Sequence, residues 1–400
     1  MLALCLCLFP TIGVLVPRSF GFLPAVIGLA FYVFLWTKEK SRPALHKPSV
    51  LIALTIYGLA AMSCLWSIDF EISFERCLKM APVFLGGVLL ISVIQNQGAE
   101  FFRIFEKYFI YALLLAAGFC VFEMLSFGSL HSAFRGVDVE YTSNLSHLNR
   151  SVVIVTLFLF PSLFLLGRYK ENCPVRAIVY GALFLILIGI IFYKTDSQSA
   201  HLAFLLGFLT LLIFPVRSRL AWKLLFGALA FLLIITPLLT QLLFKVLPPL
   251  VEDIYWFRTG YALERFEIWD FITRYMLDSP FIGHGIEATR AVESFATQML
   301  YHKDDTILHP HNFAVQFWME FGAIGIAVLT AVIAYLIKMM SSQNEHAARM
   351  YLATFIAFLS VAATGYGFWQ GWYLGLMTLL VVICMAAARG EPQPTDSEAQ

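Results

Sequence analysis

Charged residues are scarce in this sequence. Only 13% of its 400 residues are Asp, Glu, Lys or Arg, whereas about one quarter of a soluble domain is charged. Hydrophobic residues make up 60% of the chain, and the formal net charge is only +1. Such a chain has no basic field that could attract nucleic acid. The composition therefore indicates a membrane protein, with membrane lipids and not nucleic acid around it.

The short motifs of soluble enzymes are also missing. The sequence contains no Walker loop, no dinucleotide-binding glycine fingerprint, no His-Glu-x-x-His pair and no Gly-x-Ser-x-Gly elbow. Its seven cysteines are scattered without zinc spacing. A disulfide bridge between Cys64 and Cys77 is conceivable. We therefore expect neither a metal nor a cofactor.

Long apolar runs are what the sequence does contain. A membrane-spanning helix needs about 20 apolar residues, and about 17 can suffice. Twelve runs are candidates: 2–16, 19–36, 49–65, 78–95, 108–127, 151–167, 177–193, 200–214, 222–240, 312–337, 350–366 and 368–388. We expect the first to be a retained span and not a signal peptide; the eighth is short and could be tilted or re-entrant. The sequence thus predicts an all-α polytopic membrane protein with about 12 transmembrane helices.

Lys and Arg are unevenly distributed over the links between these runs. If the N-terminus is cytoplasmic, the inner links and the C-terminal tail carry 15 of them and the short outer links carry 6. Links rich in Lys and Arg stay in the cytoplasm. We therefore expect both termini to be cytoplasmic. In a bacterium, the long polar loop would then leave the inner membrane on its periplasmic side.

This topology divides the chain into four parts. They are a membrane domain with the first nine helices at 1–240, a large periplasmic loop at 241–311, a membrane domain with three helices at 312–388, and a disordered cytoplasmic tail at 389–400. Apolar residues at helical spacing predict two short amphipathic helices in the loop, at about 261–278 and 286–301.

Two histidines lie where the loop re-enters the membrane, in the segment His309-Pro310-His311-Asn312. Imidazole can accept a proton near neutral pH, so this pair could supply a general base. Pro310 restricts the backbone between the two rings. Alternatively, both rings simply lie at a wet interface. A metal pair is less favoured, because no nearby carboxylate completes a ligand set.

Several arginines lie on the same expected side of the membrane. A guanidinium such as that of Arg265 binds phosphate through two parallel hydrogen bonds and keeps its charge. The alternative is an exposed Arg265 that pairs with Glu264 or Glu267. Arg150 directly precedes an apolar run on the outer side, so it is a functional candidate unless it reaches lipid phosphate. Arg258 lies a short way upstream of Arg265 in the loop.

The link between the seventh and eighth spans is strongly polar. It reads Tyr-Lys-Thr-Asp-Ser-Gln-Ser-Ala-His over residues 193–201 and lies on the expected outer side. Asp196 or Ser197 could cap the next helix. The same segment, with Lys194 and Gln198, could equally line a site.

The tenth span carries polar residues on one face. Gln316 and Glu320 are four residues apart, and they share a helix face with Asn312. A Glu inside a membrane helix indicates a water-filled cavity or a cationic partner. We expect Arg265 or Arg150 to be that partner.

Four segments carry a resemblance to a known family. They are the Arg-x-x-x-Trp pattern from Arg265 to Trp269; the Gly-x-Gly stretch at 278–285; His311 and Asn312 followed by Gln316, Glu320, Gly322 and Gly325; and the Trp-Ser segment at 65–69. In this order and spacing, and with one large outer loop, they resemble the O-antigen ligase and polymerase superfamily of bacterial envelope glycosyltransferases.

The resemblance implies a GT-C-like enzyme that moves a glycan from polyprenyl (undecaprenyl) diphosphate to a sugar hydroxyl of lipid A-core, with inversion and without metal or nucleotide. His311 would remove the acceptor proton, and Arg265 and Arg150 would stabilise the leaving diphosphate. The other candidates for binding the diphosphate or the glycan are His309, Gln198, Lys194, Arg258, Trp269, Asn312, Gln316 and Glu320.

One position departs from the ligases of this family. They carry an Arg where this chain has Gln198, and Gln cannot supply the charge. Lys194 or Arg150 could replace it, or the substrate could differ. Two related alternatives are an O-antigen polymerase, which extends lipid-linked repeat units, and a protein-glycosylating ligase. A lipid-linked glycan transporter or flippase is less favoured, because its charges would lie at the membrane midplane and its halves would match.

Overall fold

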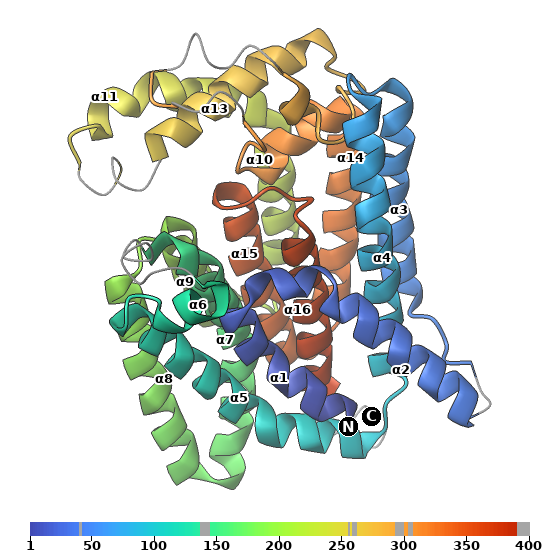
Figure 1. Ribbon diagram of the computed structural model, residues 1–400, viewed down its shortest axis with the longest axis vertical. Coiled ribbons are helices and arrows are strands. Elements are labelled where there is room, and N and C mark those ends of the chain that lie inside the picture. Colours follow the sequence, from blue (N-terminus) through green and yellow to red (C-terminus); the bar gives the residue numbers. More distant parts are fainter. Residues whose placement is uncertain are drawn as a thin grey trace.

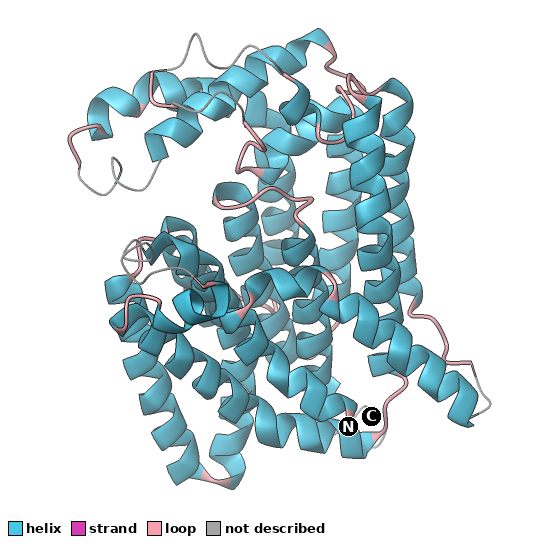
Figure 2. Ribbon diagram, viewed as in Figure 1, coloured by secondary structure: helices cyan, strands magenta, loops and turns pink. Residues whose placement is uncertain are grey.

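The computed structural model describes residues 1–39, 42–136, 145–254, 257, 262–292, 300–302 and 307–389. All regular structure within these ranges is helical, and no strand occurs in them (Figure 2). The all-α fold predicted from the apolar runs is therefore confirmed.

Nine helices in the described chain are long and apolar enough to cross a membrane. They are α3 (Lys47–Ser63, extended by a 3-10 turn, η2, to Trp66), α4 (Phe70–Gln95), α5 (Ala99–Leu125), α7 (Asn149–Asn172), α8 (Pro174–Lys194), α10 (Arg219–Val246), α14 (Phe313–Ser341), α15 (Glu345–Thr364) and α16 (Gly371–Arg389). The protein is a polytopic membrane protein by this criterion.

Three further apolar helices are shorter: α1 (Leu2–Leu15), α2 (Leu23–Glu39) and α9 (Gln198–Ile213). Together with the nine long helices they account for all twelve apolar runs. Whether these three cross the membrane completely stays a prediction. The remaining short elements are η1 (Pro17–Gly21), α6 (Ser129–Arg135), η4 (Leu145–Leu148), α11 (Pro248–Val251), α13 (Ala262–Tyr275), η5 (Met276–Asp278) and η6 (Ala288–Ala291).

The segment between α10 and α14 lies at one end of the helix bundle. Figure 1 shows α11 and α13 lying across that end, whereas the N-terminus and the last turns of α16 lie at the other end. We call these the loop end and the terminal end. Their separation agrees with a large loop on the side of the membrane opposite to both termini, although the orientation itself stays a prediction.

The first predicted loop helix is formed. Helix α13 ends at Tyr275 and is followed directly by η5, which ends before Pro280. Its apolar face buries Ile268, Trp269 and Ile272 in a cluster with Val315 and Met319 of α14. The helix therefore packs on the start of α14, and its other face carries the exposed Arg274.

The second predicted loop helix, at 286–301, is wrong over its described part. Only the 3-10 helix η6 forms there, and residues 293–299 lie outside the described residues. Glu287, just before η6, has left-handed backbone angles (φ 62°). Its carboxylate binds Arg76 and Arg290, and its backbone N–H donates to Glu320 Oε1. These tertiary bonds hold the chain in a turn where apolar spacing alone favoured a helix.

Helix α14 is broken at Gly322, which has φ 57° and ψ −150°. The backbone N–H groups of Ala323 and Ile324 donate to the carbonyls of Pro280 and Phe281, at 2.8 and 3.0 Å. On the other side of the break, the carbonyls of Met319 and Glu320 accept from His284 and Gly285, both at 2.9 Å. These four backbone groups beside the break are thus bound by the loop, as low-dielectric surroundings require.

The Trp-Ser segment and the end of α3 bind the same stretch of the loop, between residues 282 and 286. Trp66 Nε1–H donates to the carbonyl of Ile282 at 3.0 Å, and the N–H of Ile68 donates to the carbonyl of His284 at 3.1 Å. Ser63 Oγ accepts from the N–H of Ile286 at 3.0 Å. The end of α3, the Gly-x-Gly stretch and the break in α14 therefore form one hydrogen-bonded unit.

Cys64 directly follows α3, at the edge of this unit, and Cys77 of α4 lies beside it. Their Sγ atoms are 3.6 Å apart and both thiols are free. The bridge that the sequence made conceivable is therefore not formed here, although the two cysteines are indeed neighbours.

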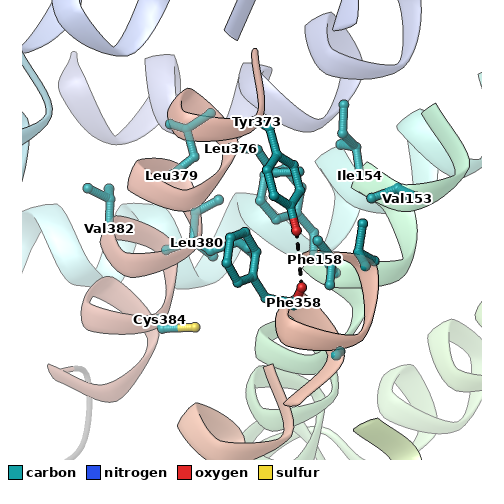
Figure 3. Packing of buried hydrophobic residues seen from close by; sticks show 14 of the residues in the cluster. Val153, Ile154, Phe158, Phe358, Tyr373, Leu376, Leu379, Leu380, Val382 and Cys384 are labelled. Atoms are coloured by element: carbon teal, nitrogen blue, oxygen red, sulfur yellow. Dashed lines mark hydrogen bonds between the residues drawn. The ribbon is translucent and has the colours of Figure 1, made fainter. Parts of the chain in front are cut away.

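A packed core fixes the link between α15 and α16. In Figure 3, Phe158 of α7 and Leu376 of α16 surround Tyr373, whose hydroxyl donates to the carbonyl of Phe358 at 3.1 Å. The rings of Phe358 and Tyr373 stack with centroids 4.9 Å apart. Both helix ends beside residues 365–370 are held in this way, so the link has a defined position at the loop end.

Gly322→Ala should destabilise the protein by roughly 3 kcal/mol, because a positive φ is strained for Ala and a close contact must also be relieved. A Cβ at this position would lie 2.6 Å from the carbonyl carbon of Phe281. Thermal unfolding in detergent measures the loss. Gly227→Ala in α10 is the control, since its Cβ meets no atom within 4 Å and Ala favours a helix. Equal unfolding temperatures in both variants would contradict this account of the break.

Candidate active site

The His309–Asn312 segment lies directly before α14. Asn312 is the N-cap of that helix, and its Oδ1 accepts from the N–H groups of Ala314 and Val315 at 2.9 and 3.2 Å. Trp269 Nε1–H of α13 donates to the carbonyl of Pro310 at 2.7 Å. Asn312 and Trp269 therefore position the two histidines, and a direct part of either in substrate binding stays a prediction.

His311 has an assigned tautomer. Its Nδ1 lies 2.7 Å from the carbonyl oxygen of Gly365, which can only accept. Nδ1 therefore carries the proton, and the Nε2 lone pair stays available as a base. The backbone of His311 is left-handed, with φ 56°, and this conformation turns the ring toward the link between α15 and α16.

His309 stacks against His311, with ring centroids 4.3 Å apart. Its Nε2 lies 3.0 Å from the side-chain amide nitrogen of Gln370, which donates. Gly367 lies against the other side of this ring, since a Cβ there would be 2.6 Å from His309 Cδ2. The predicted pair of imidazoles is thus brought together, and both rings contact the link between α15 and α16.

Arg265 lies one helical turn before Trp269 on α13 and is half-buried. No hydrogen bond or ion pair to its guanidinium occurs within the described ranges of the chain, and Glu264 binds His302 instead. Burial lowers the pKa of Arg265, but a guanidinium remains charged at neutral pH. The guanidinium of Arg265 is therefore a cation to which none of the described residues forms a hydrogen bond.

This cation acts on His311. Burial first, and then the charge of Arg265, lower the pKa of His311 to about 4, although the bond to Gly365 raises it in part. A base with this pKa is neutral across the pH range of most cells. The imidazole is therefore in its proton-accepting form at neutral pH.

Arg150 reaches the same region from the start of α7. Its guanidinium lies over the ring of Trp372, 5.5 Å from the centroid. Burial raises the pKa of the nearby Tyr366 to about 12, although the charges of Arg150 and Arg265 both lower it. Both arginines that the sequence singled out therefore act on the pKa of one tyrosine in the link between α15 and α16.

Two further arginines belong to this group. Burial and the charges of Arg290, Arg76 and Arg150, in addition to His311, lower the pKa of His309 to about 2. Arg76 of α4 lies 2.9 Å from Glu287, which also binds Arg290. Sequence reasoning missed Arg76, Arg290, Tyr366 and Gln370 as site residues. The one available signal was that Arg76 lies on the predicted outer side, where few cations are expected.

The partner predicted for Glu320 is wrong. Its carboxylate accepts from Gln316 Nε2 at 2.9 Å, from the backbone N–H of Glu287 at 3.1 Å and from the indole N–H of Trp369. No ion pair joins it to Arg265 or Arg150. Neutral donors satisfy both oxygens because the break in α14 and the link between α15 and α16 meet at this point.

Gln316 completes that connection. Its Oε1 accepts from the backbone N–H of Phe368 at 2.9 Å, while its amide group binds Glu320. These two side chains therefore hold the link between α15 and α16 against α14. Their predicted role in substrate binding stays a prediction.

The polar segment after α8 lies beside the same link. Gln198 is the first residue of α9, and a Cβ on Gly365 would lie 3.2 Å from Oγ of the neighbouring Ser199. Lys194 is exposed at the end of α8, over the ring of Tyr193. Arg258 lies outside the described residues. The described residues contain no group of three His, Cys, Asp or Glu side chains that could hold a metal ion.

Comparisons with known proteins agree with the motifs. Residues 181–330 match a family model described as O-antigen ligase. The chain is 26% identical over 347 residues to a "Putative polysaccharide ligase" of Rickettsia bellii, which covers 82% of this chain and 79% of the relative. A relative of the same description from Rickettsia conorii is 25% identical over 267 residues, covering 61% of this chain and 63% of the relative. No solved structure matches significantly.

The neutral state of His311 can be tested by NMR titration of histidine-labelled protein in detergent, with His311→Gln for assignment. We expect its ring to stay neutral from pH 8 down to about 5, because its pKa is lowered to about 4. Arg265→Gln should raise this pKa, since one lowering charge is removed. Arg274→Gln, an exposed arginine of the same helix, should leave it unchanged. Titration of the wild-type ring near 6.5 would show that His311 is not buried beside Arg265.

Proposed function

Because the resemblance to the O-antigen ligase superfamily is confirmed, we propose that this protein is an O-antigen ligase-type glycosyltransferase. It moves a glycan from polyprenyl diphosphate to a sugar hydroxyl of lipid A-core. It does so at the periplasmic face of the bacterial inner membrane, with both termini cytoplasmic. The polysaccharide ligase names of the relatives support glycosyl transfer in general, and the site geometry supports the roles assigned below.

One observation carries the mechanism: a neutral imidazole with a free Nε2 lies beside a guanidinium that has no described partner. In the transfer step, the acceptor oxygen forms a bond to the anomeric carbon, and the bond from that carbon to the diphosphate oxygen breaks. Nε2 of His311 takes the acceptor proton as the new bond forms. The lipid diphosphate leaves with the bonding electron pair.

Cations near this base stabilise the leaving group. Negative charge grows on the diphosphate as it departs, and Arg265 is placed to bind it through two parallel hydrogen bonds. Arg150, which approaches the same tyrosine, supplies a second positive charge. Since the leaving group is already a diphosphate, the step needs no nucleotide, and two arginines can take the part that a metal plays elsewhere.

Donor binding also changes the base. The Arg265 charge lowers the pKa of His311 in the empty site. A diphosphate bound to Arg265 would offset that charge and raise the pKa of His311 toward its ordinary value. The imidazole would then become a stronger base only when the donor is present. A single displacement of this kind inverts the anomeric centre.

Substitution of the two central residues tests the mechanism. His311→Gln should lower the rate of glycan transfer roughly 10²- to 10⁴-fold, as expected for loss of a general base. Arg265→Gln should lower it roughly 10²-fold or more. The assay uses purified protein in liposomes with a lipid-linked glycan and lipid A-core. Arg274→Gln and His346→Gln, both exposed positions, serve as controls. A wild-type rate in His311→Gln would remove this residue as the base.

Deletion of the gene distinguishes ligase from polymerase. Lipid A-core without attached glycan, together with accumulated lipid-linked polymer, indicates a ligase. A single repeat unit on the core indicates the polymerase, which Gln198 in place of the ligase Arg leaves open. Unchanged envelope glycans would contradict both enzymes.

A further inference from the structure

A groove opens at the end of α14 opposite the candidate active site. It lies among α10, α14 and the start of α15, and its volume is about 690 Å³. Its wall includes the apolar side chains of Trp222, Phe226, Ala334 and Ile337. A cavity of this size can hold a lipid headgroup with the first part of an acyl chain. The candidate active site uses none of these residues.

The rim of the groove is basic. Arg217, Arg219, Lys223 and Lys338 contribute four cations, against the single carboxylate of Glu345. That carboxylate is already bound: one oxygen accepts from Arg217 at 2.6 Å, and the other accepts from Arg349 at 3.2 Å. The other three cations therefore keep their full charge in the groove.

These three cations have no counter-charge of their own. The side chains of Arg219, Lys223 and Lys338 make no hydrogen bond or ion pair within the residues that the structure describes. The first turn of α10 contains no acidic residue, although it begins at Arg219. Positive side chains are disfavoured at a helix N-terminus, whose partial charge is also positive. A bound anion would offset this repulsion.

The groove also opens toward lipid. In the most apolar stretch of α10, only 17% of the residues are buried in the protein. Leu220 and Leu224, which lie beside the cations, are 64% and 63% exposed. Trp318 Nε1–H donates to the carbonyl of Leu233 at 2.8 Å and joins α14 to the middle of α10. Between this hydrogen bond and the terminal end of the bundle, the groove separates α10 from α14. An acyl chain can therefore enter from the side.

We propose that this groove binds an anionic phospholipid, whose phosphate lies among Arg219, Lys223 and Lys338 while an acyl chain lies along Phe226 and Ile337. Basic pockets between membrane helices bind such headgroups. The apolar wall favours a phospholipid over a soluble phosphate, because a soluble anion would leave that wall uncovered. The bound lipid would connect α10 to the end of α14. This site is independent of the proposed glycosyl transfer.

Native mass spectrometry of the full chain in detergent tests the proposal, with phosphatidylglycerol and phosphatidylcholine as probes. Wild type should retain phosphatidylglycerol preferentially. Each removed cation should weaken its binding roughly fivefold, so Lys223→Gln/Lys338→Gln should weaken it roughly 25-fold. Lys338→Gln alone is the milder variant if the double variant is not monodisperse. Lys223→Arg/Lys338→Arg should restore retention.

Lys47→Gln/Lys170→Gln is the matched control, because both lysines are exposed and neither lines the groove. It should retain phosphatidylglycerol as wild type does. Equal retention by the groove variants and wild type would overturn the proposal, as would equal retention of both lipids. Displacement of phosphatidylglycerol by inorganic phosphate at millimolar concentration would instead assign the groove to a soluble anion.

Discussion

The structure depends on how the broken helix α14 completes the hydrogen bonds of its backbone. At Gly322 the hydrogen-bond ladder of α14 stops, and the loop supplies the missing partners through Pro280, Phe281, His284 and Gly285. Unpaired backbone groups are costly in a low-dielectric interior, so the loop and α14 must fold together. Glu320, next to the break, then binds the link between α15 and α16. The position of His311 follows from this arrangement, since its ring binds the same link.

Much of the fold could be predicted because membranes restrict the options. A long apolar run that crosses lipid satisfies its own backbone by forming a helix, and each run that the sequence marked is helical. The motif segments also lie together: the Trp-Ser segment, the Gly-x-Gly stretch and the break in α14 form one unit, and Trp269 binds Pro310. Sequence spacing marked these residues as candidates. It did not indicate that several of them bind one another.

What could not be predicted depends on contacts between distant segments. Glu320 looked like a partner for an arginine, because a lone carboxylate in a membrane helix usually needs one. Three neutral donors from three segments satisfy it instead. Arg76 and Arg290 join the cationic group only because Glu287 binds both, and Glu287 adopts its turn where periodicity favoured a helix. No local pattern encodes such pairings.

The hydrogen bond from His311 Nδ1 to the carbonyl of Gly365 has a consequence for turnover. Many catalytic histidines hold that proton against a carboxylate, which stabilises the imidazolium formed during the reaction. A main-chain carbonyl bears no net charge, and Arg265 repels a protonated ring. In the proposed transfer, a protonated His311 would therefore be short-lived once the diphosphate departs. In the proposed mechanism, each cycle would therefore end with that proton passing to the departing lipid or to water, which would return the empty site to its neutral form.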